Sequence, residues 1–215
     1  KVARYDTRGS FTSAASWTVF DITTVNAGAK AFAGAAFDGR NLYLVPNGTS
    51  TGQHGRVARY DSEGSLTSAA SWAVFDLTTV NAGAKGFSGA AFDGRYVYLV
   101  PYNDDVGTQG RVARYDTQGS FTSAGSWTVF DLTTVDVGAR GFVGGVFDGR
   151  YLYLVPFGKG GAIHGNVARH DTRGSFASAG SWTVFNLTTV NPGATGFQGA
   201  MFDGRYVYLV PFGVT

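Results

Sequence analysis

The stretch Gly34-Ala35-Ala36-Phe37-Asp38-Gly39-Arg40-Asn41-Leu42-Tyr43-Leu44-Val45-Pro46 decides the fold, because close copies of it occur four times. The other copies begin at Gly89, Gly144 and Gly199, so each lies 55 residues after the one before it. In every copy two extended segments flank an Asp-Gly pair, the dipeptide that most readily takes the positive φ angles of a type I′ turn. We therefore predict a β-hairpin in each copy.

The remainder of each period predicts two further strands. In the second period these are Val57-Ala58-Arg59-Tyr60-Asp61 and Trp72-Ala73-Val74-Phe75-Asp76-Leu77, joined by a connection rich in Gly, Ser, Thr and Ala. No segment has helical periodicity long enough for a crossover helix. The sequence thus predicts one all-β domain over residues 1–215, built from antiparallel four-stranded repeats at 1–55, 56–110, 111–165 and 166–215.

Repeats of this length and strand number favour a β-propeller, in which each blade covers the faces of its neighbours. A solenoid fits less well, because no distinct polar capping repeats are present. The strands predicted at 2–6 and 17–22 would complete the blade whose hairpin is 199–211, which closes the ring and removes free sheet edges. We predict a monomeric four-bladed propeller; pairing of two chains in an eight-bladed ring is the alternative.

Small and aromatic residues alternate in a way that suits such a ring. The first hairpin strand is small in every copy, as in Gly34-Ala35-Ala36, which fits strands crowded round a narrow axis. We expect two sets of aromatic residues to pack between blades. They are Phe32, Phe37, Phe87, Phe92, Phe142, Phe147, Phe197 and Phe202, and the tryptophans Trp17, Trp72, Trp127 and Trp182.

The order Ala-Ala-Phe-Asp-Gly-Arg, Tyr-Leu-Val-Pro and Arg-Val-Ala-Arg-Tyr-Asp resembles the repeat of hemopexin-type four-bladed propellers. It is also similar to repeats of uncharacterised bacterial propeller proteins. The chain lacks the cysteine pair that commonly closes the hemopexin ring, and its repeats are nearly identical. In that family inner-strand carbonyls hold ions near the axis. The resemblance therefore implies an ion or water in the channel at the level of Ala35, Ala90, Gly145 and Ala200.

Composition excludes several classes of function. Without cysteine, the chain has no disulfide, no thiolate nucleophile and no cysteine-ligated zinc. Its net charge is +2 with both signs interspersed, so we expect no nucleic-acid partner. No apolar run approaches the roughly 20 residues of a membrane-spanning helix, and we expect no membrane partner. No cofactor is required by any motif, and the cellular compartment stays undetermined.

The acidic residues and histidines do not form a catalytic pattern. A group needed once for chemistry has no reason to recur in every blade, whereas a turn does, so we expect the repeated acids to brace turns. They are Asp38, Asp93, Asp148, Asp203, Asp6, Asp61, Asp116 and Asp171. The three histidines, His54, His164 and His170, are expected in surface loops. We predict no catalytic residues and no metal site formed by side chains.

Loops that follow the hairpins vary most between periods, at 47–54, 102–109 and 157–164, which marks them as a contact face for a protein or glycan. Lys30, Lys85 and Arg140 share one phase before the inner strand, so we predict a ring of cations at the channel mouth that binds an anion or polar ligand. Repeats this alike indicate recent amplification of one blade or a consensus sequence.

Three hypotheses of function remain from the sequence. The first is a non-enzymatic propeller that acts as a binding or structural module through its variable loops. The alternative is a carbohydrate-binding propeller with repeated sites between blades, lined by Trp, Tyr and Asn. A glycosidase-like enzyme is the weakest hypothesis, because its carboxylates would need different environments rather than repeated ones.

Overall fold

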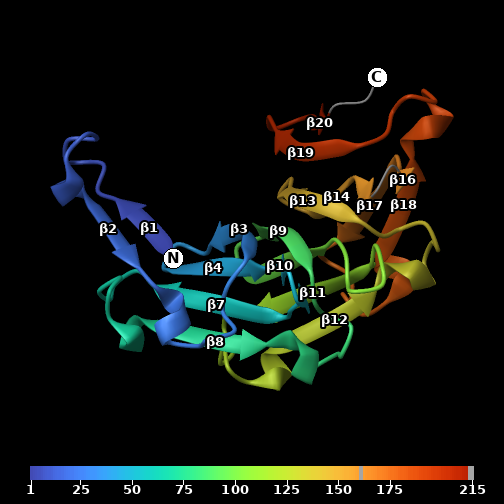
Figure 1. The fold of residues 1–215 in the computed structure, drawn as a ribbon. Coiled ribbons are helices and arrows are strands. Elements are labelled where there is room, and N and C mark those ends of the chain that lie inside the picture. Colours follow the sequence, from blue (N-terminus) through green and yellow to red (C-terminus); the bar gives the residue numbers. More distant parts are fainter. Residues whose placement is uncertain (160–161, 213–215) are drawn as a thin grey trace.

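A computed structural model describes residues 1–159 and 162–212; the end of the last predicted repeat, residues 213–215, lies outside the described residues. Three antiparallel four-stranded sheets make up most of it (Figure 1). The first sheet contains β3 (Phe32–Phe37), β4 (Asn41–Pro46), β7 (Arg56–Asp61) and β8 (Trp72–Asp76). The second contains β9 (Phe87–Phe92), β10 (Tyr96–Pro101), β11 (Arg111–Asp116) and β12 (Trp127–Asp131). The third contains β13 (Phe142–Phe147), β14 (Tyr151–Pro156), β17 (Asn166–Asp171) and β18 (Trp182–Asn186), which confirms the all-β class and the four-stranded repeat.

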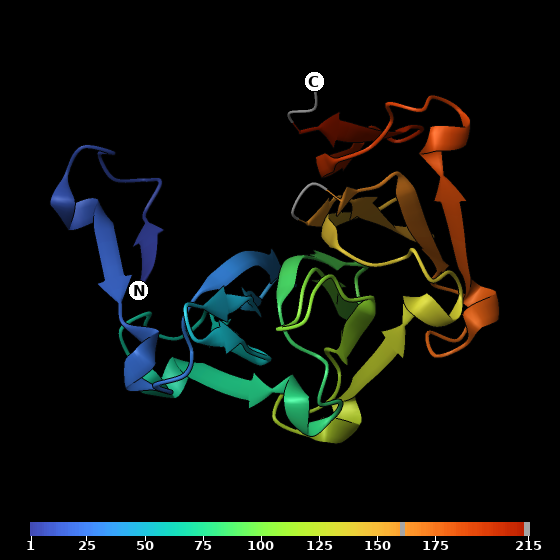
Figure 2. The same cartoon turned by 45° about the vertical axis from the view of Figure 1, so that its right-hand side comes forward.

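Two half-sheets flank the three complete ones. At one end β1 (Val2–Tyr5) pairs with β2 (Trp17–Phe20), and at the other β19 (Phe197–Phe202) pairs with β20 (Val207–Pro211). We call these the N-terminal and C-terminal half-sheets. They lie on opposite sides of an open gap, and the pairing of β1 with β20 that the sequence predicts is not formed (Figures 1 and 2). The closed four-bladed ring therefore stays a prediction.

Short elements fill the connections between the strands. Single 3₁₀ turns occur at Ala14–Ser16, Ile22–Thr24, Ala69–Ser71, Leu77–Thr79, Ala124–Ser126, Leu132–Thr134, Ala179–Ser181 and Leu187–Thr189. Small hairpins lie in the variable loops, formed by β5 (Gly48–Thr49) with β6 (Gly52–Gln53) and by β15 (Gly158–Lys159) with β16 (Ala162–Ile163). The strand predicted to end at Leu77 ends at Asp76, because Asp76 Oδ1 accepts the Thr78 N–H at 3.1 Å and starts a 3₁₀ turn.

The Asp-Gly turn differs from the predicted type I′ turn. Gly39 has φ of 100°, whereas Asp38 is not among the residues with positive φ, so only the first central residue is left-handed, as in a type II′ turn. Asp38 instead precedes the turn and accepts hydrogen bonds from the Arg40 and Asn41 N–H groups and from the Tyr43 hydroxyl. The carboxylate thus fixes both the turn and the tyrosine that follows it.

The sheets stack through their first strands, with β3, β9, β13 and β19 as successive neighbours. The backbones approach closely where each strand carries a glycine: a Cβ on Gly34 would lie 3.0 Å from Gly89 Cα, and one on Gly89 would lie 2.8 Å from Gly144 Cα. Both contacts require glycine. Small inner-strand residues therefore set the spacing of the sheets, as the sequence predicts.

Replacing Ala31 by glycine is expected to stabilise the fold. Ala31 has φ of 58° and is the one described non-glycine residue with positive φ; its equivalents are Gly86, Gly141 and Gly196. An L-residue with a side chain costs about 1–2 kcal/mol in this conformation, so Ala31→Gly should raise the free energy of unfolding by about 1 kcal/mol in a denaturant titration.

The reverse change at the equivalent position provides the control. A Cβ on Gly86 would overlap the carbonyl oxygen of Asn103, and the backbone there has φ of 66°. Gly86→Ala should therefore destabilise the protein. Equal effects of Ala31→Gly and Gly86→Ala on the unfolding midpoint would contradict this account of the turn.

Candidate functional site

The interface between the first and second sheets shows how two neighbouring sheets fill one another. Tyr43, Val57, Phe75 and Leu77 of the first sheet and its following turn, with Val97 and Leu99 of the second, line one side of a buried core. Ala113, Tyr115, Phe121 and Trp127 fill it from the outer strands of the second sheet and their connection. Phe75 stacks on Trp127 with ring centroids 5.5 Å apart and planes at 7°. Arg59 lies over the ring of Phe121 at 4.9 Å.

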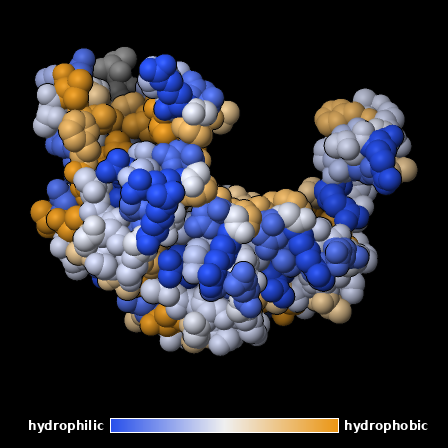
Figure 3. All heavy atoms as spheres, turned by 180° about the vertical axis from the view of Figure 1, so that it is seen from behind, coloured by the Kyte–Doolittle hydropathy of each residue, from blue (hydrophilic) through white to orange (hydrophobic). Residues whose placement is uncertain are grey.

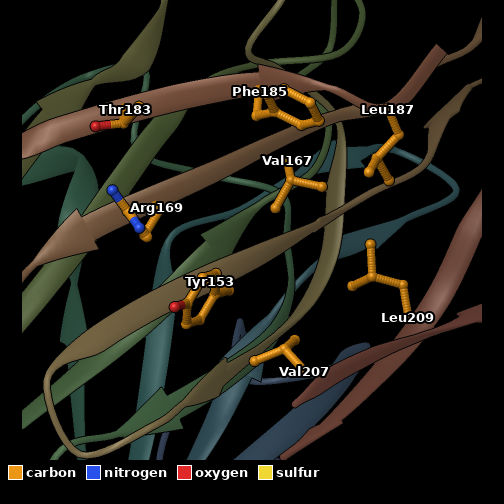
Figure 4. Close-up of a pocket in the computed structure, with 8 residues that line it drawn as sticks. All are labelled: Tyr153, Val167, Arg169, Thr183, Phe185, Leu187, Val207 and Leu209. Atoms are coloured by element: carbon orange, nitrogen blue, oxygen red, sulfur yellow. The ribbon is translucent and has the colours of Figure 1, made fainter. Parts of the chain in front are cut away.

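The same interface is open at the C-terminal end of the molecule. A hollow of about 400 Å³ lies over the third sheet and the C-terminal half-sheet, and we call it the C-terminal socket (Figure 4). Its lining residues are Tyr153, Val167, Arg169, Thr183, Phe185, Leu187, Val207 and Leu209, each 110 residues after a residue of the filled interface. Phe185 is 53% exposed, whereas its equivalent Phe75 is 9% exposed. The socket is thus a repeat interface without its filling.

The matching filling lies on the N-terminal half-sheet. Ala3, Tyr5, Phe11 and Trp17 are 110 residues before Ala113, Tyr115, Phe121 and Trp127. Tyr5, Phe11 and Trp17 already contact one another, with Tyr5 and Trp17 stacked at 4.9 Å, as Tyr115 and Trp127 are at 4.8 Å. Phe11 is 67% and Trp17 40% exposed, against 2% for Phe121 and 4% for Trp127. This N-terminal aromatic cluster is preformed and uncovered.

A second, reciprocal pair of surfaces exists. The N-terminal socket is a hollow of about 470 Å³ that includes Val2, Ile22, Phe32 and Leu44, the equivalents of Val57, Leu77, Phe87 and Leu99. In the filled interface the latter four pack against Tyr43 and Val45. The corresponding residues of β20 are Tyr208 and Val210, which are 52% and 50% exposed. Each end of the molecule therefore carries both a socket and the filling for the other end.

The predicted cations do not gather in one hollow of the described structure. Lys30 lines a hollow of about 190 Å³ between two loops, together with His54, Arg56 and Asp105. Lys85 forms an ion pair with Asp105. Arg140 lines a separate hollow of about 470 Å³ together with Asp104, Arg111 and Asp131. Whether these cations bind an anion stays a prediction.

The predicted channel positions share one register on the inner strands. Ala35, Ala90, Gly145 and Ala200 lie on β3, β9, β13 and β19, opposite Leu44, Leu99, Leu154 and Leu209 respectively. Neighbouring inner strands bring these positions to successive places along the open arc. The ion or water that the family resemblance implies at this level stays a prediction.

The repeated aspartates brace turns, as predicted. In the hairpins, Asp93 accepts hydrogen bonds from the Arg95 and Tyr96 N–H groups and from the Tyr98 hydroxyl. At the strand ends, three such aspartates pair with the arginine of the preceding hairpin. These pairs are Arg40–Asp61 at 2.8 Å, Arg95–Asp116 at 2.7 Å and Arg150–Asp171 at 2.7 Å. The guanidinium groups lower the pKa of the three carboxyls through charge-assisted hydrogen bonds.

The histidines are not surface loop residues, so that prediction was wrong. His54 Nδ1 accepts the Arg56 N–H and its Nε2 donates to the Lys30 carbonyl, an arrangement that braces a loop. His170 is fully buried and stacks on Trp182 at 4.6 Å. Its Nδ1 lies 3.2 Å from the Ser181 carbonyl, while its Nε2 has no hydrogen-bond partner. Over residues 1–159 and 162–212, no three His, Asp or Glu side chains cluster as metal ligands would.

His170→Tyr is expected to stabilise the protein and to reduce its sensitivity to acid. At the equivalent positions the Tyr60 and Tyr115 hydroxyls donate to the Gly64 and Gly119 carbonyls at 2.7 and 2.8 Å. A tyrosine at 170 would regain this bond, worth about 1 kcal/mol, and remove the unpartnered ring nitrogen. Burial lowers the pKa of His170 in the folded state, so folding stability should fall as pH drops below about 6.5, the ordinary histidine value.

Urea titrations at pH 7.5 and pH 5.5 measure both effects. His170→Tyr should be more stable at pH 7.5 and should lose less stability at pH 5.5, because one of three buried histidines with a lowered pKa is removed. Tyr115→His is the matched control and should show the opposite change in both. The same pH dependence in all three proteins would refute the assignment.

No model of a known family and no curated protein matches the sequence. No helix in the described part of the chain has the length and apolarity to cross a membrane. Among solved structures, the chain is similar to the crystal structure of the computationally designed Ika8 protein. The identity is 9%, the match covers 84% of this chain and 68% of that chain, and the TM-score is 0.30. That similarity is too weak to bear on the fold or function of this chain.

Proposed function

We propose that this chain is a non-enzymatic β-propeller module with a structural and binding role. In this proposal an N-terminal half-sheet and a C-terminal half-sheet join as one blade and close the ring. The observation that carries it is the match between the sockets and their fillings. Every position of the C-terminal socket has an equivalent in a buried interface, and the N-terminal aromatic cluster supplies the missing side chains.

The environments of the acids support a role without catalysis. Enzymes that use pairs of carboxylates hold them in different surroundings, so that one acts as acid and the other as base. Here the turn aspartates Asp38, Asp93 and Asp203 accept the same set of bonds in their separate repeats, two from backbone N–H groups and one from a tyrosine hydroxyl. Such repetition is what a structural role requires.

The variable loops are the proposed contact face for a partner. They differ in local structure, since two carry small hairpins and the third has a single bridge between Asn103 and Thr108. They also contact one another: the Gln53 N–H donates to Asp105 Oδ1 at 2.7 Å. A hemopexin-like ring with a channel ion is compatible with this module and remains part of the proposal. The carbohydrate-binding alternative has less support, because Trp72, Trp127 and Trp182 are buried and their ring faces are unavailable for sugar stacking.

A register-specific disulfide tests whether the half-sheets form one blade. In the three complete sheets, Asn41, Tyr96 and Tyr151 pair with Asp61, Asp116 and Asp171. The same register pairs Tyr206 with Asp6. Because the chain has no cysteine, Asp6→Cys with Tyr206→Cys should form a disulfide under mild oxidation, detected by mass spectrometry of non-reduced peptides.

Two further pairs act as controls for this disulfide. Asn41→Cys with Asp61→Cys lies in a complete sheet and should form a disulfide within one chain. Asp6→Cys with Val207→Cys places the two thiols on opposite faces of the joined sheet, so it should form none. If the pair at 6 and 206 stays reduced while the pair at 41 and 61 oxidises, the split blade and the propeller proposal are both refuted.

A further inference from the structure

We propose that the occupant of both sockets is a second copy of this chain, so that two copies exchange half-sheets and close one ring. This inference rests on the proposed function, since it concerns which chain completes the split blade. It commits to a partner that the sequence leaves open beside a monomeric ring. The partner surface is defined by the repeat itself: an apolar half-sheet whose residues match the interior interfaces position by position.

The packing of the half-sheets argues against simple closure within one chain. Phe20 stacks on Trp72 at 5.6 Å, as Phe75 does on Trp127, and Arg4 donates to the Tyr60 hydroxyl. The N-terminal half-sheet is therefore already seated on the first sheet in the way that interior sheets are seated. At the other end β19 lies against β13 and β14. With both ends seated, the gap between them remains open, so closure by one chain would have to alter interfaces that are already filled.

The shape of the open molecule fits two copies. From behind, the molecule has two arms on either side of a wide opening, with apolar atoms gathered on the C-terminal arm (Figure 3). Two such open arcs can face one another, each N-terminal half-sheet meeting the C-terminal half-sheet of the other copy. Because every end carries one socket and one filling, the exchange is the same in both directions, as a two-fold symmetric dimer requires. The resulting ring has no free sheet edge.

Charge adds a specific contact at this junction. The three complete sheets each hold an arginine of the hairpin turn against the aspartate that ends the next strand. The equivalent pair is Arg205 with Asp6. Among the described residues, Arg205 makes no ion pair and Asp6 pairs with its near neighbour Arg8 at 3.0 Å. Joining two copies would provide the fourth arginine–aspartate pair of the series.

Mixing two single-cysteine variants tests the exchange directly. Asp6→Cys and Tyr206→Cys proteins are combined, unfolded, refolded together and mildly oxidised. If a second copy completes the blade, a disulfide-linked heterodimer carrying both mutations should appear on a non-reducing gel. Analytical ultracentrifugation of the wild type should give twice the chain mass of 22.6 kDa. Arg205→Asp should raise the dimer dissociation constant several-fold, and adding Asp6→Arg in the same chain should restore most of the loss.

The outcomes separate this inference from the proposed function. A monomeric mass, with a disulfide within the double-cysteine chain and none between mixed variants, would overturn the exchange and leave the propeller proposal standing. Absence of a disulfide in both experiments would overturn both. A ladder of masses above two chains would overturn the closed two-copy ring, because open head-to-tail joining does not terminate.

Discussion

Each sheet of this repeat has two apolar faces, and the rest of the structure depends on covering both. The second sheet shows the constraint most clearly. Along β10, Val97 and Leu99 belong to the core shared with the first sheet, while Tyr98 and Val100 belong to the core shared with the third. Because side chains alternate between faces, such a sheet is stable only between two neighbours. The end sheets have one neighbour each, which leaves their other faces exposed.

The same constraint separates what the repeats share from what distinguishes them. Residues at the faces recur at a spacing of 55 because every interface must accept the same side chains. The loops at 47–54 and 102–109 are free of this requirement, and they differ in both sequence and local structure. Arg140 and Lys30 lie in hollows beside these loops. Recognition of a partner is therefore placed on the loop face, and assembly on the sheet faces.

Much of the fold could be predicted from sequence because the period multiplies every local signal. The strands, the inner glycines and the bracing role of the aspartates followed from residues that recur in phase. The turn type did not, because Asp38 is more valuable as an acceptor before the turn than inside it. Burial of His170 was missed because its ring replaces a tyrosine within an aromatic cluster, although that substitution was itself the signal. The sockets could have been found by asking which interface residues lack an equivalent 110 positions later.

Hydrogen–deuterium exchange of the wild-type protein tests the central claim most directly. If the exposed ends are two halves of one interface that is covered in solution, amides of β20 should exchange as slowly as those of β14, its equivalent within the third complete sheet. Amides of β1 should likewise match those of β11. Rapid exchange throughout β1 and β20, together with slow exchange in β11 and β14, would show that the ends stay open and would contradict the account.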